Sequence, residues 1–460
     1  MLSAINIILL LLCGVTFLGG YYLSKSWKRI NVINNDDFSE IETYGKSLYI
    51  IATVLLIAFA GYHISVWLHW ETHVLEWLTL LIRWAHVVLG IAWIGASFYF
   101  IFLENSLNRT ENLRDELAGN LWAIHGGGFY YLEKFKVAPK ELPKTLHWFK
   151  YEAYFTWLTG FILLLLVYYI NAKAYLVDPA VKDISPDTAI YIGLGSMISG
   201  WLIYDFLCRT SLIHKKTMFA VTGFLILTAI SFLLSQYLSG RAAFMHVGAL
   251  LGTIMAGNVF FVIIPAQKAM VAAAKKGIPV NPELGKFAGL RSLHNNYITL
   301  PVIFVMISNH FPVTYSGSSN WIILGLLTLG SVAVRHYINL HEKGIYAKWM
   351  LPFAVISVFA LVIITAPDKG KKYDRVVTDA EVRTIINARC ITCHSSHPTD
   401  STQLISPNGV MFDTQEQLKQ HADRIYVRAV QTKTMPQGNK TGITEEERTI
   451  LGAWIEQNKN

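Results

Sequence analysis

A short cysteine and histidine pattern near the end of the chain is the residue group best suited to do chemistry. Cys390 and Cys393 are separated by two residues, and His394 follows directly. Two thiols one helical turn apart can bond the two vinyl groups of a porphyrin, and the adjacent histidine then reaches the iron. The spacing is therefore typical of covalent haem attachment, with a disulfide or half of a zinc site as the alternatives.

A methionine farther along the chain provides the second axial ligand that such an iron uses. Met435 lies in an expected loop and is followed by a proline, and Met411 is the rival candidate. A thioether opposite a histidine raises the iron potential and suits the transfer of single electrons. We therefore expect the two cysteines, His394 and Met435 to hold one haem c.

A second group of polar side chains lies within or beside long apolar stretches. Such groups are costly in a bilayer and usually functional, although a single histidine or asparagine can also join two helices by a hydrogen bond. The group comprises His63, Arg83, His86, Asp205, Arg241, His246, Asn258, Arg291, His294, Asn295, Asn296, Asn309, His310, Arg335 and His336.

Histidines on facing helices can hold a haem b or a metal inside a helical bundle. Candidate ligands of such a second redox centre are His86, His147, His246, His294 and His336. The alternatives are that these histidines bind a substrate or satisfy one another by hydrogen bonds. The residues alone leave these possibilities open.

The apolar stretches that position these side chains are long enough to cross a bilayer. Of the 460 residues, 53% are hydrophobic and 15% are charged, whereas soluble domains carry about 25% charged residues. This composition excludes a soluble globule, a disordered chain and a disulfide-rich scaffold. A membrane core needs about 20 apolar residues per helix. Ten runs approach this length: 4–23, 47–69, 76–104, 152–171, 189–208, 217–237, 242–267, 292–310, 321–340 and 348–366.

Loop charges predict the orientation of this bundle. The first run is followed, and not preceded, by basic residues, which argues against a cleaved signal peptide and places the N-terminus outside. The inner connections then carry 20 Lys and Arg residues and the outer ones carry three, as the positive-inside rule requires. The net charge of +8 is therefore a signal of topology and not of nucleic-acid binding.

The sequence predicts an all-α protein, a polytopic transmembrane bundle of about ten spans with both termini outside, followed by a small all-α domain like a class I cytochrome c. The tail begins with a capping box at Thr378–Glu381 and ends with an amphipathic helix at Glu445–Asn458. The expected parts are two N-terminal helices (1–70), a membrane domain (71–366), a linker (367–376) and a periplasmic haem domain (377–460).

Several segments of the chain, in the same order, are similar to those of one family. They are Trp122–Tyr130, His147–Tyr154, Arg241–Gly248, Arg291–Tyr297 and Ser308–His310. Together with the fused c-type domain, they resemble the bacterial membrane-bound urate hydroxylases (urate oxidases) of purine breakdown. The resemblance runs from about Trp70 to the C-terminus and leaves the first two spans unmatched.

The resemblance implies that the protein converts urate to 5-hydroxyisourate in the bacterial inner membrane. Electrons would pass through the haem c to a respiratory cytochrome c or a terminal oxidase. A flat anion such as urate needs a cation, amide groups and a base. The catalytic candidates are His86, His246, His294, His310, Arg83, Arg291, Asn295 and Asn296, with Arg241, Arg335, Asn258, Asn309, His125, His147 and His336 as further members of these classes.

Two other readings predict different behaviour. A respiratory subunit that oxidises quinol would show b-haem spectra and inhibition by quinone analogues. A transporter with a redox-sensing tail would move its substrate without reducing the haem. The urate reading predicts that urate alone reduces the c haem.

Overall fold

The computed structural model describes residues 70–366, 375–400 and 405–458, with the single positions Thr53, Ala60, Gly61 and Tyr373. Contacts divide the chain into a unit Met1–Leu78 and a unit Thr79–Asn460, and the second contains nearly all described residues. The two expected N-terminal spans, His63 and most of the expected linker lie outside the described residues. The structure therefore does not test the predicted orientation of the first span.

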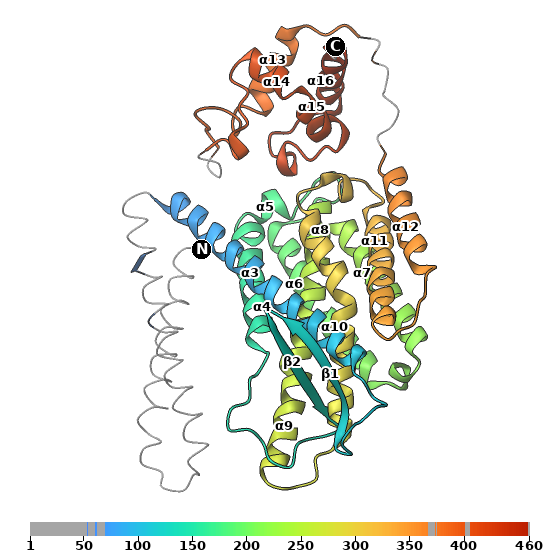
Figure 1. Cartoon of the computed structure of the whole chain (residues 1–460). Helices are drawn as coiled ribbons and strands as arrows, with labels where there is room; N and C mark the ends of the chain where they lie inside the picture. Colours follow the sequence, from blue (N-terminus) through green and yellow to red (C-terminus); the bar gives the residue numbers. More distant parts are fainter. Residues whose placement is uncertain are drawn as a thin grey trace. The chain divides into compact units, whose positions relative to one another are not determined.

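Long helices form the described part of the expected membrane domain (Figure 1). Each of the eight apolar runs between residues 76 and 366 coincides with a helical segment, so these expected helices are confirmed. The helices are α3 (Glu71–Ser106), α4 (Tyr151–Leu163) with its extension η2 (Leu164–Tyr169), α5 (Ala172–Tyr175), α6 (Pro186–Arg209), α7 (Lys216–Tyr237), α8 (Gly240–Gly257), η4 (Asn258–Ile263), α9 (Ile264–Lys275), α10 (Pro282–Ser308), α11 (Asn320–His341) and α12 (Met350–Ile364).

Six of the described helical segments are long and apolar enough to span a membrane. They are His73–Ser106, Tyr151–Tyr169, Pro186–Arg209, Lys216–Tyr237, Gly240–Lys275 and Asn320–His341. The prediction of ten spans is therefore corrected to about six in the part of the chain that the structure describes. Helix α10 falls short because the polar run around Asn295 lowers its hydropathy, and α12 has only 15 residues. The chain is a multi-pass membrane protein by this measure.

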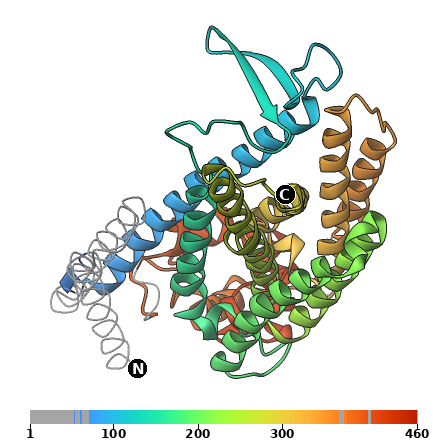
Figure 2. The same cartoon turned by 90° about the horizontal axis from the view of Figure 1, so that it is seen from below.

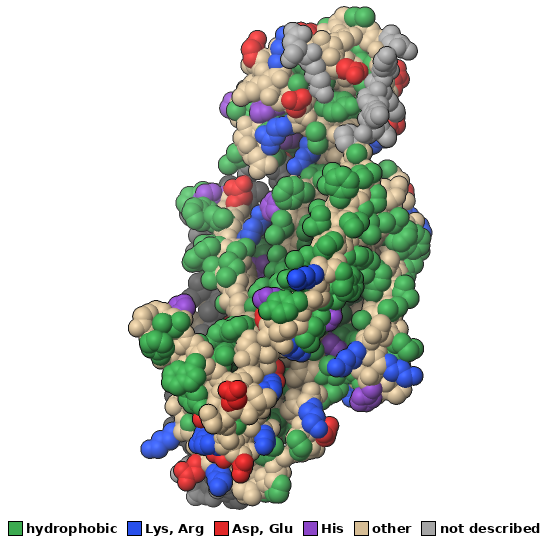
Figure 3. Space-filling view, turned by 45° about the vertical axis from the view of Figure 1, so that its right-hand side comes forward, with side chains coloured by type: hydrophobic (Ala, Val, Ile, Leu, Met, Phe, Trp, Pro, Cys, Tyr) green, Lys and Arg blue, Asp and Glu red, His purple; other side chains and the backbone are tan. Residues whose placement is uncertain are grey.

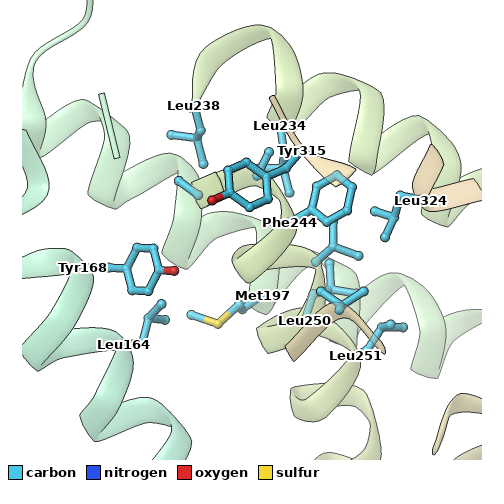
Figure 4. Packing of buried hydrophobic residues seen from close by; sticks show 14 of the residues in the cluster. Leu164, Tyr168, Met197, Leu234, Leu238, Phe244, Leu250, Leu251, Tyr315 and Leu324 are labelled. Atoms are coloured by element: carbon cyan, nitrogen blue, oxygen red, sulfur yellow. The ribbon is translucent and has the colours of Figure 1, made fainter. Parts of the chain in front are cut away.

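Helix α8 forms the centre of the bundle. It packs against α4, α6, α7 and α10 (Figure 2) and buries most of its residues. The apolar core around it includes Met197 from α6, Phe244 and Leu250 from α8 and Leu324 from α11 (Figure 4). A helix that is buried on nearly all sides needs little polar surface, which agrees with its mostly apolar composition.

The exposed flank of the bundle is apolar, whereas charged side chains gather at one end. Figure 3 shows hydrophobic side chains over the flank and Lys, Arg, Asp and Glu at the lower end, where Figure 1 places α9. Leu202 and Phe206 of α6, Leu225 of α7 and Val355 of α12 are among the exposed large hydrophobic residues. Such a belt fits a lipid environment because lipid tails, unlike water, accept apolar surface.

A β-hairpin corrects the all-α prediction. Strands β1 (Leu117–His125) and β2 (Gly128–Phe135) pair antiparallel through a two-residue turn at Gly126 and Gly127. Both turn residues have positive φ angles, 59° and 82°, which glycine adopts without steric cost. Such turns match the twist of paired strands and favour a tight hairpin. The glycines at positions 126 and 127 therefore make the turn of the hairpin.

The C-terminal region forms a separate helical core. Its helices are α13 (Asp379–Arg389), α14 (Gln415–Gln420), α15 (Ala422–Ile425) and α16 (Glu445–Gln457). The expected capping box is confirmed, because Thr378 and Glu381 bond reciprocally to each other's backbone N–H groups. The expected amphipathic helix is confirmed as α16, which buries Leu451, Trp454 and Ile455.

Candidate functional site

A buried ion pair joins α6 to α10. The guanidinium of Arg291 is 0% exposed, and its Nη2 lies 2.7 Å from Oδ1 of Asp205. The other carboxylate oxygen accepts a hydrogen bond from Arg209, whose side chain is 70% exposed. Arg291 also donates to Oδ1 of Asn258 at 3.1 Å. The buried cation is thus matched by one carboxylate and one amide.

Amide and aromatic groups extend this network across three segments. Asn258, the first residue of η4, donates to Oδ1 of Asn295 at 2.8 Å and to the hydroxyl of Tyr204 at 3.0 Å. That hydroxyl also lies 2.9 Å from Nδ1 of His294. Asn295 in turn donates to the carbonyl of Met255. Three of the expected candidates, Arg291, His294 and Asn295, therefore belong to one hydrogen-bonded group.

A second polar group lies at the contact of α10 with α11. Nε of Arg335 and Nδ2 of Asn339 both donate to Oδ1 of Asn296, at 2.8 and 3.1 Å. Next to them, the hydroxyl of Tyr297 lies 2.5 Å from Nδ1 of His336. Each group thus places a tyrosine–histidine pair beside a buried arginine, an arrangement that can hold an anion and move a proton.

His246 lies apart from both groups at the centre of the bundle. It is 0% exposed, its Nδ1 donates to the carbonyl of Ala242, and its Nε2 accepts from the hydroxyl of Tyr169 at 3.0 Å. The facing helix approaches closely, because a Cβ atom on Gly193 would lie 2.2 Å from that Nε2. Glycine at this position is therefore what allows the imidazole to fit between α6 and α8.

Replacing Gly193 with alanine tests this packing. The added methyl group would overlap an imidazole that is fixed by two hydrogen bonds, and overpacking of this kind costs about 1–3 kcal/mol. We expect a lower midpoint of thermal unfolding for the detergent-purified protein. Gly195→Ala is the matched control, since its Cβ would meet nothing within 4 Å and alanine favours the helix. An equal midpoint for both variants would contradict the close contact.

The remaining candidates are separate from these groups. Nδ1 of His86 in α3 lies 3.0 Å from the carbonyl of Thr156 in α4. Arg241 donates to Asn309 and lies over the ring of Tyr175, 4.9 Å from its centre. The structure places Arg83, His125, His147 and His310 at exposed positions.

Histidines were also expected as ligands of a membrane haem or metal. The described residues hold no group of three or more His, Cys, Asp or Glu side chains that could bind a metal ion. Both ring nitrogens of His246 are hydrogen-bonded, and His147 lies in an exposed connection. No contact in the described part of the structure tests whether two of these histidines hold a haem, so this ligand pair stays a prediction.

Sequence reasoning missed four polar members of the bundle, Tyr169, Tyr204, Tyr297 and Asn339. Tyrosine is common in apolar helices, so its presence there gives no warning. A periodicity signal was present in one case, because Asn339 lies four residues after Arg335 and residues four apart share one face of a helix. For Tyr204 the only signal was its position directly before Asp205 in the sequence.

The haem-binding candidates occupy the turn that follows α13. The backbone N–H of His394 donates to the carbonyl of Cys390, so the two cysteines and the histidine share one tight turn. Nδ1 of His394 donates to the carbonyl of Val410 at 2.9 Å, which leaves the lone pair on Nε2, the atom that binds iron. Burial raises the pKa of Cys390 to about 12 and lowers the pKa of His394. The two free thiols and the oriented imidazole are the groups that covalent haem attachment uses.

The loop that carries Met435 is held by the backbone. Its N–H donates to the carbonyl of Arg428 at 2.9 Å, and its carbonyl accepts from Arg448 at 2.8 Å. Arg448 is itself a buried residue of α16, so it joins this loop to that helix. The fold therefore fixes the backbone of Met435, while its role as an iron ligand stays a prediction.

Comparisons with known proteins add one finding to this geometry. The model of the urate oxidase N-terminal family matches residues 72–366, which is the whole bundle from α3 to α12 and more than half of the chain. None of the curated proteins and none of the solved structures in the comparisons matches the chain. Because this match covers more than half of the chain, and both buried polar groups lie within it, the chain belongs to the urate oxidase N-terminal family.

Proposed function

We propose that the protein oxidises urate to 5-hydroxyisourate in its helical bundle and passes the electrons to a haem c in its C-terminal region. The family match over residues 72–366 is the observation that carries this proposal. It covers the segment in which Arg291, Arg335 and their amide partners are buried among apolar helices. Buried polar groups in a membrane bundle are expensive and usually serve function.

The overall reaction assigns a task to each class of side chain. Urate and water give 5-hydroxyisourate, two protons and two electrons. A buried guanidinium can bind the urate anion, and amide groups can pair with its carbonyl and N–H groups. The pairs Tyr204–His294 and Tyr297–His336 are placed to accept and relay the protons.

The electrons need an acceptor that this chain itself can hold. His394 and Met435 would hold the iron of a haem c, a group that supplies one-electron transfer when bound. The structure supports the attachment turn by the free thiols of Cys390 and Cys393 and by the orientation of the imidazole. Loss of electrons to a respiratory cytochrome c or a terminal oxidase would complete the cycle without peroxide.

The cellular location follows from the same scheme. Six long apolar helices support a multi-pass protein of a bacterial inner membrane. Haem is attached to such motifs outside the cytoplasm, and the excess of basic residues in alternate loops supports an outer, periplasmic position for residues 377–460. The same position results whether or not α10 and α12 both cross the bilayer, because leaving out two crossings keeps the number of crossings even.

The decisive experiment adds urate to the purified full-length protein without oxygen. We expect the reduced-haem absorption band to appear with urate alone, because the bundle supplies electrons to the haem of the same chain. The same spectrum reveals any b-type haem. If the band appears only with a quinol, the protein is a quinol-oxidising electron-transfer subunit, and the proposal is wrong.

A further inference from the structure

Arg335 differs from the other buried arginine of the bundle in its charge balance. It is 2% exposed, and it makes no ion pair with any residue that the structure describes. Glu342 is close enough to interact with it electrostatically, but that carboxylate accepts a hydrogen bond from Asn105. Arg291, in contrast, contacts the carboxylate of Asp205 directly. Arg335 therefore retains a charge that an anionic ligand could match.

Arg335 and its neighbour Asn339 each have one buried polar atom without a hydrogen-bond partner in the described part of the chain. These atoms are Nη2 of Arg335 and Oδ1 of Asn339. The two side chains lie next to each other, since both donate to the same oxygen of Asn296. Because Oδ1 of Asn296 only accepts hydrogen bonds, the NH₂ group of Asn339 must face it. The other amide atom of Asn339, its Oδ1, is therefore turned away from Asn296. One donor and one acceptor are thus left unpaired on two neighbouring side chains, which is unfavourable unless a bound water or a ligand pairs them.

The surroundings of this pair suit a flat ring. The ring of Phe98 in α3 lies 4.3 Å from the guanidinium carbon of Arg335. Asn296 also contacts the carbonyl of Ser97 in the same helix. The Tyr297–His336 pair is adjacent in sequence to both Asn296 and Arg335, so a proton acceptor is available near the cation. A planar, anionic ligand with both carbonyl and N–H groups matches the cation, the unpaired donor and acceptor, the aromatic ring and the nearby tyrosine–histidine pair.

One residue of a surface pocket contacts the backbone of Asn339. A surface pocket at the end of α3 is lined by Asn105, Asn108, Thr110 and Lys343 among others. The side-chain amide of Asn105 donates to the backbone carbonyl of Asn339 at 3.4 Å and to Glu342 at 2.8 Å. Asn105 therefore connects the lining of this pocket to the backbone of Asn339.

We infer that Arg335 and Asn339 bind the oxopurine anion on which the protein acts. The guanidinium Nη2 donates to a carbonyl oxygen of the ring, and Oδ1 of Asn339 accepts from a ring N–H. Asn296 orients both side chains by accepting a hydrogen bond from each of them. Arg291 is a positioning residue of the neighbouring network. This inference rests on the proposed function and names the binding residues of the same reaction.

Urate binding to variants of the full-length protein tests the assignment. Dithionite-reduced protein is used for equilibrium dialysis, because a reduced haem accepts no electrons and urate is then not consumed. Arg335→Gln is expected to raise the Kd for urate at least about tenfold, since a charge-assisted hydrogen bond is lost. Asn339→Asp is expected to do the same by placing a carboxylate beside the cation. The KM of haem reduction should rise in parallel.

The controls separate binding from folding. Arg335→Lys keeps the charge but loses the planar fork, so it should bind urate more weakly while the protein still folds. Arg114→Gln removes an arginine whose side chain is 56% exposed, and it should leave the Kd unchanged. Haem content and the elution volume in size-exclusion chromatography report whether each variant folds.

The outcomes for the site and for the activity are distinct. If urate neither binds nor reduces the unaltered protein, the proposed function fails. If urate reduces it normally, and Arg335→Lys and Asn339→Asp fold with a Kd within twofold of its value, the function stands and this binding site is overturned.

Discussion

Replacing Asp205 with leucine is expected to remove most of the folded protein from the membrane fraction. The change leaves Arg291, which is 0% exposed, without the carboxylate that neutralises it. Breaking a buried ion pair in this way costs about 3–5 kcal/mol. That is a large share of the roughly 5–15 kcal/mol by which folded proteins are stable. The measurement is the yield and the thermal midpoint of the protein in size-exclusion chromatography after detergent extraction.

The same carboxylate provides its own matched control. Asp205 contacts a second arginine, Arg209, whose side chain is 70% exposed. Arg209→Gln should change stability by only about 0–1 kcal/mol, because solvent screens an exposed pair. The double variant Asp205→Leu/Arg291→Leu should recover much of the yield, since no unpaired charge remains buried. Equal losses for Asp205→Leu and Arg209→Gln would contradict the distinction between the two pairs.

This ion pair bears on how the expected catalytic residues are interpreted. Arg291, Asn295 and His294 were expected as catalytic candidates, and the structure brings them together with Asp205 and a tyrosine. A cation that a carboxylate already matches has less to offer an anion than one without such a partner. The network around Arg291 therefore suits the positioning of helices, and the group around Arg335 suits the binding of substrate.

The sequence predicted the helices well because their signals are local. Continuous apolar runs predicted α6, α7 and α11, a capping box predicted the start of α13, and an amphipathic pattern predicted α16. The hairpin was missed because its strands lie in a connection between two apolar runs that is rich in aromatic and glycine residues. In the described part of the chain, two of the expected spans do not qualify, because polar residues lower the hydropathy of α10 and because α12 has only 15 residues.

The sequence predicted which polar residues belong to the candidate site, but not which of them form hydrogen bonds or ion pairs with one another. Arg291, Asn296 and Arg335 were identified because charged and amide groups inside apolar stretches are rare. Which of them has a carboxylate partner depends on contacts between residues far apart in the chain, such as Asp205 with Arg291. The position of Asn339 beside Arg335 was visible as a four-residue spacing, but its unpaired oxygen is a property of the packed structure.

Replacing His394 with alanine is expected to abolish electron delivery from urate to a respiratory acceptor. In the proposed scheme the imidazole is an axial ligand of the haem iron, and its hydrogen bond to the carbonyl of Val410 orients it for that role. Without this ligand the iron loses its low-spin state and its raised potential, so steady-state turnover should fall by about a hundredfold or more. Turnover is measured with urate and an added cytochrome c under controlled oxygen.

Two controls locate the effect in the haem domain. His397→Ala removes an exposed histidine three residues away and should leave turnover unchanged. The urate Kd of His394→Ala should equal that of the unaltered protein, because the binding residues proposed above belong to the bundle and not to the C-terminal region. Normal turnover by His394→Ala, or by protein from a strain that cannot attach haem to cysteines, would mean that the electrons leave the bundle by another route. The urate-oxidising assignment of the bundle would then stand without the haem, since the two parts carry separate halves of the reaction.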